Sequence, residues 1–264
     1  MSRIALVLAP NPGPFTLEGT NTWVVGSPPC LVIDPGPDNP GHREAVLAQA
    51  GDVGMILLTH HHPDHAEGAA RLGAQAGAPV RAFHPGPNEG PIADGEVIRT
   101  AGQSIRAIHT PGHTDDHLVF LELATGSLFT GDAVLGRGTS VIDPPEGDMA
   151  AYMGSIGKMI GLRPVAIYPG HGPVVSPALP KLQYYLEHRR DRERQVLAAL
   201  ADEGRTPEEL VQQIYQGYPQ SLHAAAARSI LAHLLKLEPE DRVEKVGPPG
   251  TERYALHRPG LTGD

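Results

Sequence analysis

One short histidine-rich segment, residues 59–65 with the sequence THHHPDH, carries the strongest chemical signal in this chain. Its spacing, HxHxDH, offers four side chains that could bind metal. Imidazole nitrogens and carboxylate oxygens suit zinc and other borderline first-row metals. Four ligands packed this closely are too many for one tetrahedral ion, so the segment predicts two neighbouring metals. The four candidate ligands are His60, His62, Asp64 and His65.

Three later turns each place one ligand-type residue in a glycine-containing turn just after an expected strand. The end of a strand is a rigid mount, and glycine lets the backbone bend close to an ion. Any one of these turns could be ordinary, but four such sites in series predict a shared metal centre. The three residues and their strands are His113 after Ile105–His109, Asp132 after Ser127–Thr130, and His171 after Val165–Tyr168.

At these residues the sequence resembles the metallo-beta-lactamase superfamily of dinuclear metallohydrolases. The resemblance implies an α+β fold, a four-layer αβ/βα sandwich with the metals at one edge. It also implies a division of the ligands between two ions, with one aspartate bridging them. The first metal would be held by His60, His62 and His113, the second by Asp64, His65 and His171, and the bridge would be Asp132.

The chemistry that follows from such a site is hydrolysis. A bound metal can lower the pKa of water to about 7, and a metal pair can share the resulting hydroxide while stabilising the anion that develops on the substrate. Asp64 and Asp132 are the catalytic candidates, because Asp64 could orient the hydroxide and Asp132 would hold both metals. Two Zn²⁺ ions are the expected cofactors, with Mn²⁺ or iron as alternatives. His61 and His117 could support the ligands or could serve the fold alone.

A more specific resemblance extends along nearly the whole chain. Residues 15–22, 113–117, 131–139, 168–173 and 233–237 are similar to the beta-lactamase-like protein 2 family. That family includes an endoribonuclease acting on single-stranded RNA, and related sequences include thioesterases that release acyl chains from carrier proteins. The resemblance therefore leaves two substrate classes open: a small-molecule or acyl substrate with an ester or thioester bond, and single-stranded RNA with a phosphodiester bond.

Other branches of the superfamily fit less well. Zinc beta-lactamases typically lack the bridging aspartate, and Cys30 lies outside the ligand turns, so it cannot replace a ligand there. Long-substrate RNA processors carry inserted arms or domains, and the interval between Asp132 and His171 has no room for one. Glyoxalase II shares the seven ligands but has a different C-terminal region.

Composition limits the remaining classes. The formal net charge of −9 over 264 residues disfavours a broad nucleic-acid footprint. The single cysteine, Cys30, allows no intramolecular disulfide, so the chain does not require an oxidising compartment. The N-terminus has no signal-peptide pattern, and no segment reaches the ~20 apolar residues that span a bilayer. We therefore expect a cytoplasmic protein with no membrane partner, and its oligomeric state stays open.

The elements that must position the ligands alternate short apolar runs with Gly/Pro turns, and helices punctuate the strands. This order predicts two sheets with helices outside them. Further expected strands are Ile4–Leu8, Trp23–Val25, Leu31–Ile33, Met55–Leu58, Val80–Ala82 and Leu118–Leu123, and expected helices are His42–Ala50, Ala66–Ala76 and Met149–Ile160.

The pattern changes near Pro180, which predicts a catalytic domain over residues 1–180 and a second domain over residues 181–264. Three helices followed by a hairpin is typical of a winged helix. The middle helix should begin at Thr206 as N-cap, with Pro207 at N1 and Glu209 at N3. The expected elements are helices over Lys181–Glu203, from Thr206, and over Leu222–Leu237, then strands Val243–Val246 and Arg253–Leu256.

The role of this second domain has two interpretations. Residues 187–264 contain 11 Lys/Arg and 13 Asp/Glu, whereas a dedicated DNA reader is usually basic, so we favour a packing or lid domain. The alternative is a nucleic-acid-binding regulator whose metal site is structural or sensing. Arg137, which stands between two glycines shortly after Asp132, could equally be an anion contact or an exposed loop residue.

Overall fold

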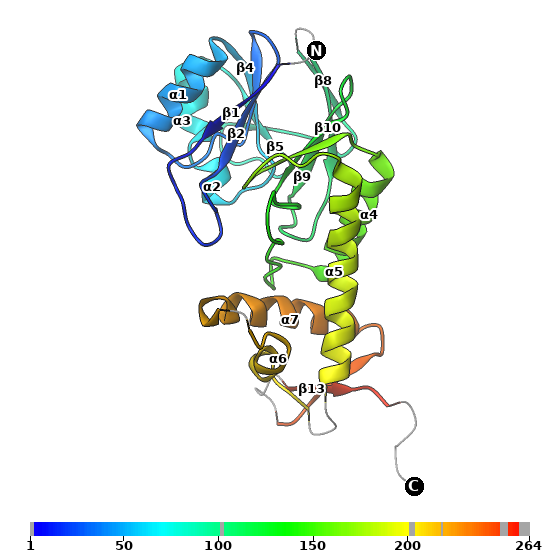
Figure 1. Cartoon of the computed structure of the whole chain (residues 1–264). Coiled ribbons are helices and arrows are strands. Elements are labelled where there is room, and N and C mark those ends of the chain that lie inside the picture. The colour runs from blue at the N-terminus through cyan, green and yellow to red at the C-terminus, as the bar shows by residue number, and fades with distance from the viewer. Residues whose placement is uncertain (1–2, 101–102, 201–203, 218, 249–252, 259–264) are drawn as a thin grey trace.

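The structure is a computed structural model that describes residues 3–100, 103–200, 204–217, 219–248 and 253–258. Two sheets and the helices outside them form the upper body in Figure 1, and a smaller helical part lies below it. The long helix α5 (Ala178–Ala199) runs from one part into the other. Within the described residues, no helix is both long and apolar enough to cross a membrane.

The first sheet has six strands in the order β1-β2-β3-β4-β5-β6. The first three pair antiparallel, and the pairs from β3 to β6 are parallel. Helices α1 (Pro40–Ala50) and α3 (Ala69–Ala76) cover its outer face. The strands are β1 (Ile4–Leu8), β2 (Asn21–Val25), β3 (Cys30–Ile33), β4 (Val53–Leu57), β5 (Val80–Ala82) and β6 (Glu89–Pro91).

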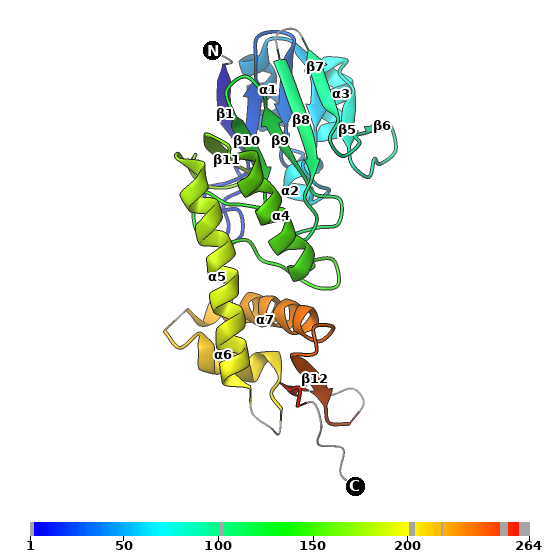
Figure 2. The same ribbon diagram turned by 90° about the vertical axis from the view of Figure 1, so that its right-hand side faces the viewer.

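The second sheet has five strands in the order β11-β10-β9-β8-β7, all antiparallel except the pair β10 and β11. Helix α4 (Met149–Leu162) and the first half of α5 cover its outer face, as Figure 2 shows. The strands are β7 (Val97–Thr100), β8 (Gln103–His109), β9 (Leu118–Glu122), β10 (Ser127–Gly131) and β11 (Ala166–Pro169).

The layers follow from side chains that alternate along buried strands. In β3, Leu31 and Ile33 join the core between the two sheets, whereas Cys30 and Val32 join the core under α1 and α3. Successive strand residues point to opposite faces, so a strand covered on both faces must be apolar throughout. A third apolar cluster joins the second sheet to α4 and α5. The predicted α+β four-layer sandwich is therefore confirmed.

Two predictions about local structure need correction. The single helix expected over Ala66–Ala76 is wrong, because the chain forms a short helix α2 (Pro63–Ala66) and then α3. Gly68 separates them, and its N–H donates to the carbonyl of Gly36 at 2.9 Å. A side chain at this position would stand 3.0 Å from that carbonyl oxygen, so the close approach depends on glycine. The strands β6 and β7 had no expected counterpart.

The C-terminal part contains the predicted three helices and hairpin. Helix α6 (Pro207–Ile214) starts with the predicted capping box, in which Thr206 and Glu209 bond each other's backbone N–H. The other elements are the 3-10 turn η1 (Gln220–Leu222), α7 (His223–Leu237), β12 (Val243–Val246) and β13 (Arg253–Leu256). The expected helix Lys181–Glu203 corresponds to α5, and residues 201–203 lie outside the described residues.

Helices α5 and α7 bind the two parts together. Along α5, Leu182 and Tyr185 belong to the core of the second sheet, whereas Val196 belongs to the C-terminal core. On α7, Ala232 packs in the core of the second sheet, while Leu234 packs in the C-terminal core. The expected domain boundary at Pro180 falls inside α5, and the division into residues 1–180 and 181–264 stays a prediction.

Candidate metal centre

The ends of four strands bring all seven predicted ligands to one edge of the sandwich. The segment with His60, His62, Asp64 and His65 follows β4, and Pro63 begins the short helix α2 within it. The other three ligands follow β8, β10 and β11 in turn. These are His113, Asp132 and His171.

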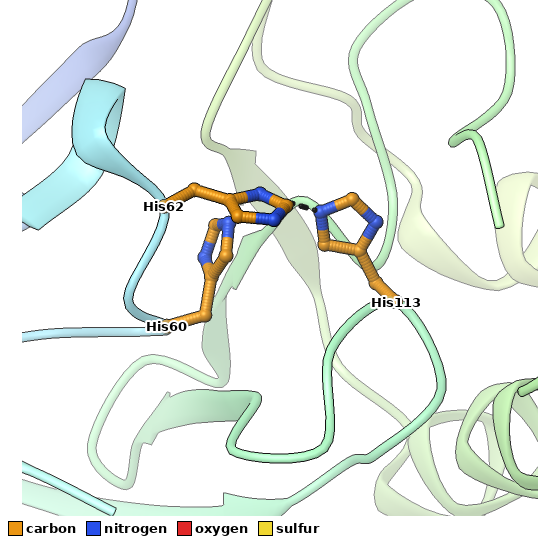
Figure 3. A group of neighbouring side chains, drawn as sticks. All are labelled: His60, His62 and His113. Atoms are coloured by element: carbon orange, nitrogen blue, oxygen red, sulfur yellow. Dashed lines mark hydrogen bonds between the residues drawn. The ribbon is translucent and has the colours of Figure 1, made fainter. Parts of the chain in front are cut away.

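Three histidines form the first group. The rings of His60, His62 and His113 point toward one another from two different loops (Figure 3), and one nitrogen from each lies within 4.8 Å of the others. The Nδ1 of His62 lies 3.2 Å from the Nε2 of His113. Two nitrogens bound to one tetrahedral zinc at ~2.0–2.1 Å would be separated by roughly 3.3 Å, so this spacing fits a shared ion.

The second group consists of Asp64, His65 and His171, whose ligand atoms also lie within 4.8 Å of one another. The Nε2 atoms of His65 and His171 are 3.3 Å apart. Asp64 Oδ2 lies 3.2 Å from His171 Nε2 and 3.5 Å from His65 Nε2. These three atoms therefore enclose a position with the spacing that a single metal ion requires.

The carboxylate of Asp132 lies between the two groups. Its Oδ2 is 3.7 Å from His113 Nε2, and its Oδ1 is 3.4 Å from the Nε2 atoms of both His65 and His171. One oxygen thus faces each group, which is the arrangement that a bridging ligand needs. Two-metal sites place their ions about 3.5–4 Å apart, within the span of one carboxylate.

Hydrogen bonds at the far ring nitrogens orient the histidines. His113 Nδ1 donates to the carbonyl of Val141 at 3.0 Å, and His171 Nδ1 donates to that of Gly19 at 3.1 Å. His60 Nδ1 lies 3.0 Å from the hydroxyl of Thr59. His60 Nε2 is buried and has no hydrogen-bond partner among the described residues. A buried nitrogen held in this way is costly unless it binds something, and a metal ion satisfies it.

Asp34 is a supporting residue that the sequence interpretation missed. Its Oδ2 lies 2.8 Å from His65 Nδ1, and both of its oxygens accept hydrogen bonds from Thr59. A carboxylate behind a ligating histidine orients the ring and raises its basicity. The signal was present in the sequence, because Asp34 follows the apolar run Leu31–Ile33 and precedes Pro35 and Gly36, as the other ligand turns do.

The charges at the candidate site favour a bound cation, and His65 would give up its proton when a metal binds. Burial would raise the pKa of Asp132, but the neighbouring His65 and His171 lower it far below its usual range, so the carboxylate stays ionised. Burial and the charge of His65 hold the pKa of His60 well below its ordinary value, so this ring stays neutral. Burial opposes a charge on His65, yet Asp132 and Asp34 raise its pKa well above normal. Negative charge at this position favours a bound cation.

Backbone space at Gly170 is part of the site. A Cβ at this position would stand 2.6 Å from Cε1 of His65 and 2.8 Å from Oδ1 of Asp132. Real side chains do not approach this closely, so either the chain or the ligands would have to move. The glycine before His171 therefore lets β11 end directly against the ligands.

Buried side chains from the outer helices hold the loop that carries Asp132. Tyr152 on α4 donates to the carbonyl of Ala133 at 2.7 Å, and Tyr185 on α5 accepts from the N–H of Leu135 at 2.8 Å. Ser140 donates to the carbonyl of Asp132, and Arg189 on α5 donates to the carbonyl of Ser140. The loop that carries Asp132 is thus anchored by helices distant in sequence, which the sequence pattern did not indicate.

Four further residues stand near the ligands without joining the two groups. His61 is exposed and lies between Asp116, at 3.1 Å, and Glu146, at 2.8 Å. His117 is fully buried, and its Nδ1 lies 3.0 Å from the hydroxyl of Thr110. Arg137 pairs with Glu18 at the surface. His61, His62 and Glu146 form another ligand-type group, but it lies at the exposed rim.

A pocket of about 910 Å³ opens beside the ligands. Five of the predicted ligands line it: His62, Asp64, His113, Asp132 and His171. Its opposite wall comes from the C-terminal part, through residues of α6 and the start of α7. Much of the remaining lining is apolar: Pro14, Phe15, Leu17, Leu135, Val141, Val211, Leu222, Ala224, Ala225 and Ala227.

Family comparisons agree with this geometry. A profile described as the metallo-beta-lactamase superfamily matches residues 15–87 and 79–171. A profile described as a beta-lactamase associated winged helix domain matches residues 206–251. The first match covers every predicted ligand, and the second covers the middle of the predicted winged helix, without its first helix or its last strand.

Individual relatives extend the similarity to the whole chain. A beta-lactamase-like protein 2 homolog from Drosophila melanogaster is 34% identical over 98% of this chain and 95% of the relative. An atrochrysone carboxyl ACP thioesterase from Aspergillus fumigatus is 37% identical over 75% of this chain and 65% of the relative.

Among solved structures, a metallo-beta-lactamase family protein from Thermus thermophilus is similar to this chain with a TM-score of 0.81 and 25% identity, covering 96% of this chain and 98% of that protein. A protein solved in a di-iron-bound form has a TM-score of 0.55 and 27% identity, covering 66% of this chain and 96% of that protein. The seven predicted ligands therefore converge in a fold of which a similar solved structure holds two iron ions.

Proposed function

Because this chain belongs to the metallo-beta-lactamase superfamily and is a metal-dependent hydrolase, we propose that it hydrolyses an acyl ester or thioester with two metal ions. His60, His62 and His113 would hold one ion, Asp64, His65 and His171 the other, and Asp132 would bridge them. Zinc suits this ligand set, and iron or manganese would also bind His and Asp. The placement of the Asp132 carboxylate between the two histidine groups supports the two-metal proposal most directly.

Residues of the chain would hold the metals, orient the attacking water and exclude other water molecules. A bound metal pair would supply an acidified water and positive charge to stabilise the anion that forms during acyl transfer. Asp132 stays ionised and fixes the spacing of the two ligand groups. Asp64 lines the pocket, where its carboxylate can accept a hydrogen bond from the attacking water and orient it. The apolar lining excludes other water molecules from the acyl group.

The pocket lining favours an acyl substrate over a nucleic acid. Its two arginines, Arg137 and Arg228, are each paired with a carboxylate, from Glu18 and Asp143 respectively. The lining also contains further acidic groups and many apolar residues. A groove that follows a phosphate backbone needs unpaired positive charge, which the paired arginines of this pocket do not supply. The thioesterase named among the relatives acts on an acyl carrier substrate, in agreement with this choice.

The position of α7 supports a structural role for the winged helix. In helix-turn-helix proteins, the recognition helix must enter the DNA groove. Here the third helix of the unit, α7, lies between the sandwich and α6 (Figure 1), and nine of its fifteen residues are buried. Arg228 on α7 donates to Asp143 and to the carbonyl of Pro144 in the catalytic part. We therefore propose that this domain packs against the site and does not read nucleic acid.

A direct test compares four substrates on one preparation. Purified protein, with its metal content measured by mass spectrometry, is assayed with an acyl thioester, a lactone, a beta-lactam and a single-stranded RNA oligonucleotide. We expect close to two ions per chain and hydrolysis of the thioester or lactone, lost in His62→Ala. RNA cleavage that disappears in the same variant, without acyl hydrolysis, would replace this proposal with the ribonuclease alternative.

A further inference from the structure

The pocket beside the ligands has one wall from each part of the chain. On the catalytic side, the apolar lining comes from the loop around Phe15 and Leu17 and from Leu135 and Val141. On the opposite side it comes from α6, from η1 and from the first two turns of α7. The apolar residues of this second wall are Val211, Leu222, Ala224, Ala225 and Ala227, and the same elements add the polar residues Glu208, Gln212, His223 and Arg228.

Between His223 and Arg228, the α7 residues that line the pocket are all alanines. Ala224, Ala225 and Ala227 each present only a methyl group, so the volume there depends on the size of these residues. Ala224 is exposed, Ala225 is half-buried and Ala227 is buried. The first two positions can therefore accept larger side chains without entering the C-terminal core, and such side chains would fill the pocket.

Helix α7 is fixed relative to the metal edge. Just after the alanines, Arg228 bonds Asp143 and the carbonyl of Pro144, which belong to the loop lining the same pocket. One turn further on, Ala232 packs in the core under the second sheet. Because both anchors join α7 to the catalytic part, the alanine wall stands at a set position opposite His113 and Asp132.

We propose that the first two turns of α7 form an acyl-binding wall, and that the natural substrate is an ester or thioester with a bulky apolar acyl group. The proposal rests on the acyl hydrolase function and adds the identity of the acyl class. Ligand pockets hold drug-sized molecules in about 300–1,000 Å³, and this one measures about 910 Å³. An acetyl group would leave most of the apolar lining in contact with water, whereas a long or ring-containing acyl group would cover it.

The first measurement varies the acyl chain and keeps the leaving group. Thioesters of N-acetylcysteamine with acetyl, hexanoyl and decanoyl groups are compared by kcat/KM with the metal-loaded enzyme. Each methylene that becomes buried should raise kcat/KM by up to about fourfold, the ratio expected for transfer from water to an apolar site. The decanoyl substrate should therefore exceed the acetyl substrate by well over tenfold.

The second measurement replaces alanines of the wall with leucine, which fills part of the pocket. Ala225→Leu and Ala224→Leu should each lower kcat/KM for the decanoyl substrate at least tenfold, and the decanoyl-to-acetyl ratio of kcat/KM should fall with it. Ala74→Leu is the matched control, because Ala74 is exposed on α3 and does not line the pocket. Its chain-length profile should equal that of the original protein. Having two independent wall variants covers the case in which one of them folds poorly.

A binding measurement tests the acyl-binding wall separately from the acyl hydrolase function. Calorimetry with the non-hydrolysable S-decyl thioether of N-acetylcysteamine should show binding to the original protein and at least tenfold weaker binding to the wall variants. If acetyl and decanoyl thioesters are hydrolysed equally and the thioether does not bind, the acyl wall is rejected while the hydrolase stands. If no acyl compound is hydrolysed but the thioether binds and the wall variants weaken it, the wall stands and the reaction is different.

Discussion

The carboxylate of Asp34 lies 2.8 Å from Nδ1 of His65, on the side of the ring opposite Asp132. Two hydrogen bonds from Thr59 fix that carboxylate in turn. The candidate site therefore includes more residues than its seven proposed ligands. Asp34, which directly follows strand β3, orients His65, a proposed ligand from a different loop.

Removing this support should weaken metal binding without removing a ligand. Asp34→Ala is expected to lower metal affinity about 10- to 100-fold, the usual effect of losing a partner behind a ligating histidine. Competition with a fluorescent zinc chelator measures the change. Asp52→Ala is the matched control, because Asp52 is exposed beside α1 and has no place in the site. Equal affinity in the two variants would show that Asp34 does not support His65.

Asp132 should matter for both metals. We expect Asp132→Ala to retain at most one ion per chain and to lose activity by on the order of a hundredfold or more, because the removed carboxylate faces both ligand groups. The number of metal ions per chain and kcat should both fall in this variant. Two tightly held ions and undiminished turnover in this variant would contradict the bridging role.

Gly170 tests whether backbone space is essential. Gly170→Ala should reduce metal content and activity sharply, although no ligand is changed, because the new methyl group would collide with His65 and Asp132. Gly161→Ala in α4 provides the comparison, since nothing lies within 4 Å of its added carbon. That variant should keep its metals and gain about 0.5–1 kcal/mol in the free energy of unfolding. Similar behaviour of both variants would argue against the steric explanation.

His233 should make the folded state sensitive to acid. Burial, helped by Arg189, lowers the pKa of His233 to about 3, against ~6.5 in an unfolded chain. Between these values the unfolded chain binds a proton that the folded chain does not. The contribution of His233 to the stability of the folded state is therefore fully present above pH 6.5, and it is lost as the pH drops toward 3.

The size of this effect can be measured by substitution. Between pH 7 and pH 5, the free energy of unfolding of the original protein should fall by about 2 kcal/mol more than that of the His233→Leu variant. Urea unfolding at the two pH values, followed by circular dichroism, gives the difference within each protein. Only the slopes are compared, so any constant cost of the substitution cancels. Parallel slopes would mean that His233 is not the buried neutral group described here.

The full-length protein should bind DNA only weakly. Helix α7 lies between the sandwich and α6 and is mostly buried, so it cannot enter a groove without breaking its anchors. A gel-shift titration with random and selected duplexes should show no sequence preference. Tight, sequence-dependent binding that weakens steeply with salt would favour the regulator interpretation.

The sequence by itself determined which residues could hold metal and in which kind of fold. Ligand chemistry depends on local features: the HxHxDH spacing, the glycine turns at His113, Asp132 and His171, and the apolar runs before them. The order of short apolar runs and helices along the chain likewise indicated two sheets with outer helices. The break at Gly68 was missed, since it depends on contact with the distant carbonyl of Gly36.

Only the tertiary structure decided how those residues are supported and what surrounds them. Three side-chain contacts join segments that lie far apart in the chain. They link Tyr152 to the loop after Asp132, Asp34 to His65, and Arg228 to Asp143. No local pattern encodes such pairs, because they follow from how whole layers pack. The placement of α7 opposite the ligands is of the same kind, and it turns a predicted packing domain into one wall of the proposed substrate pocket.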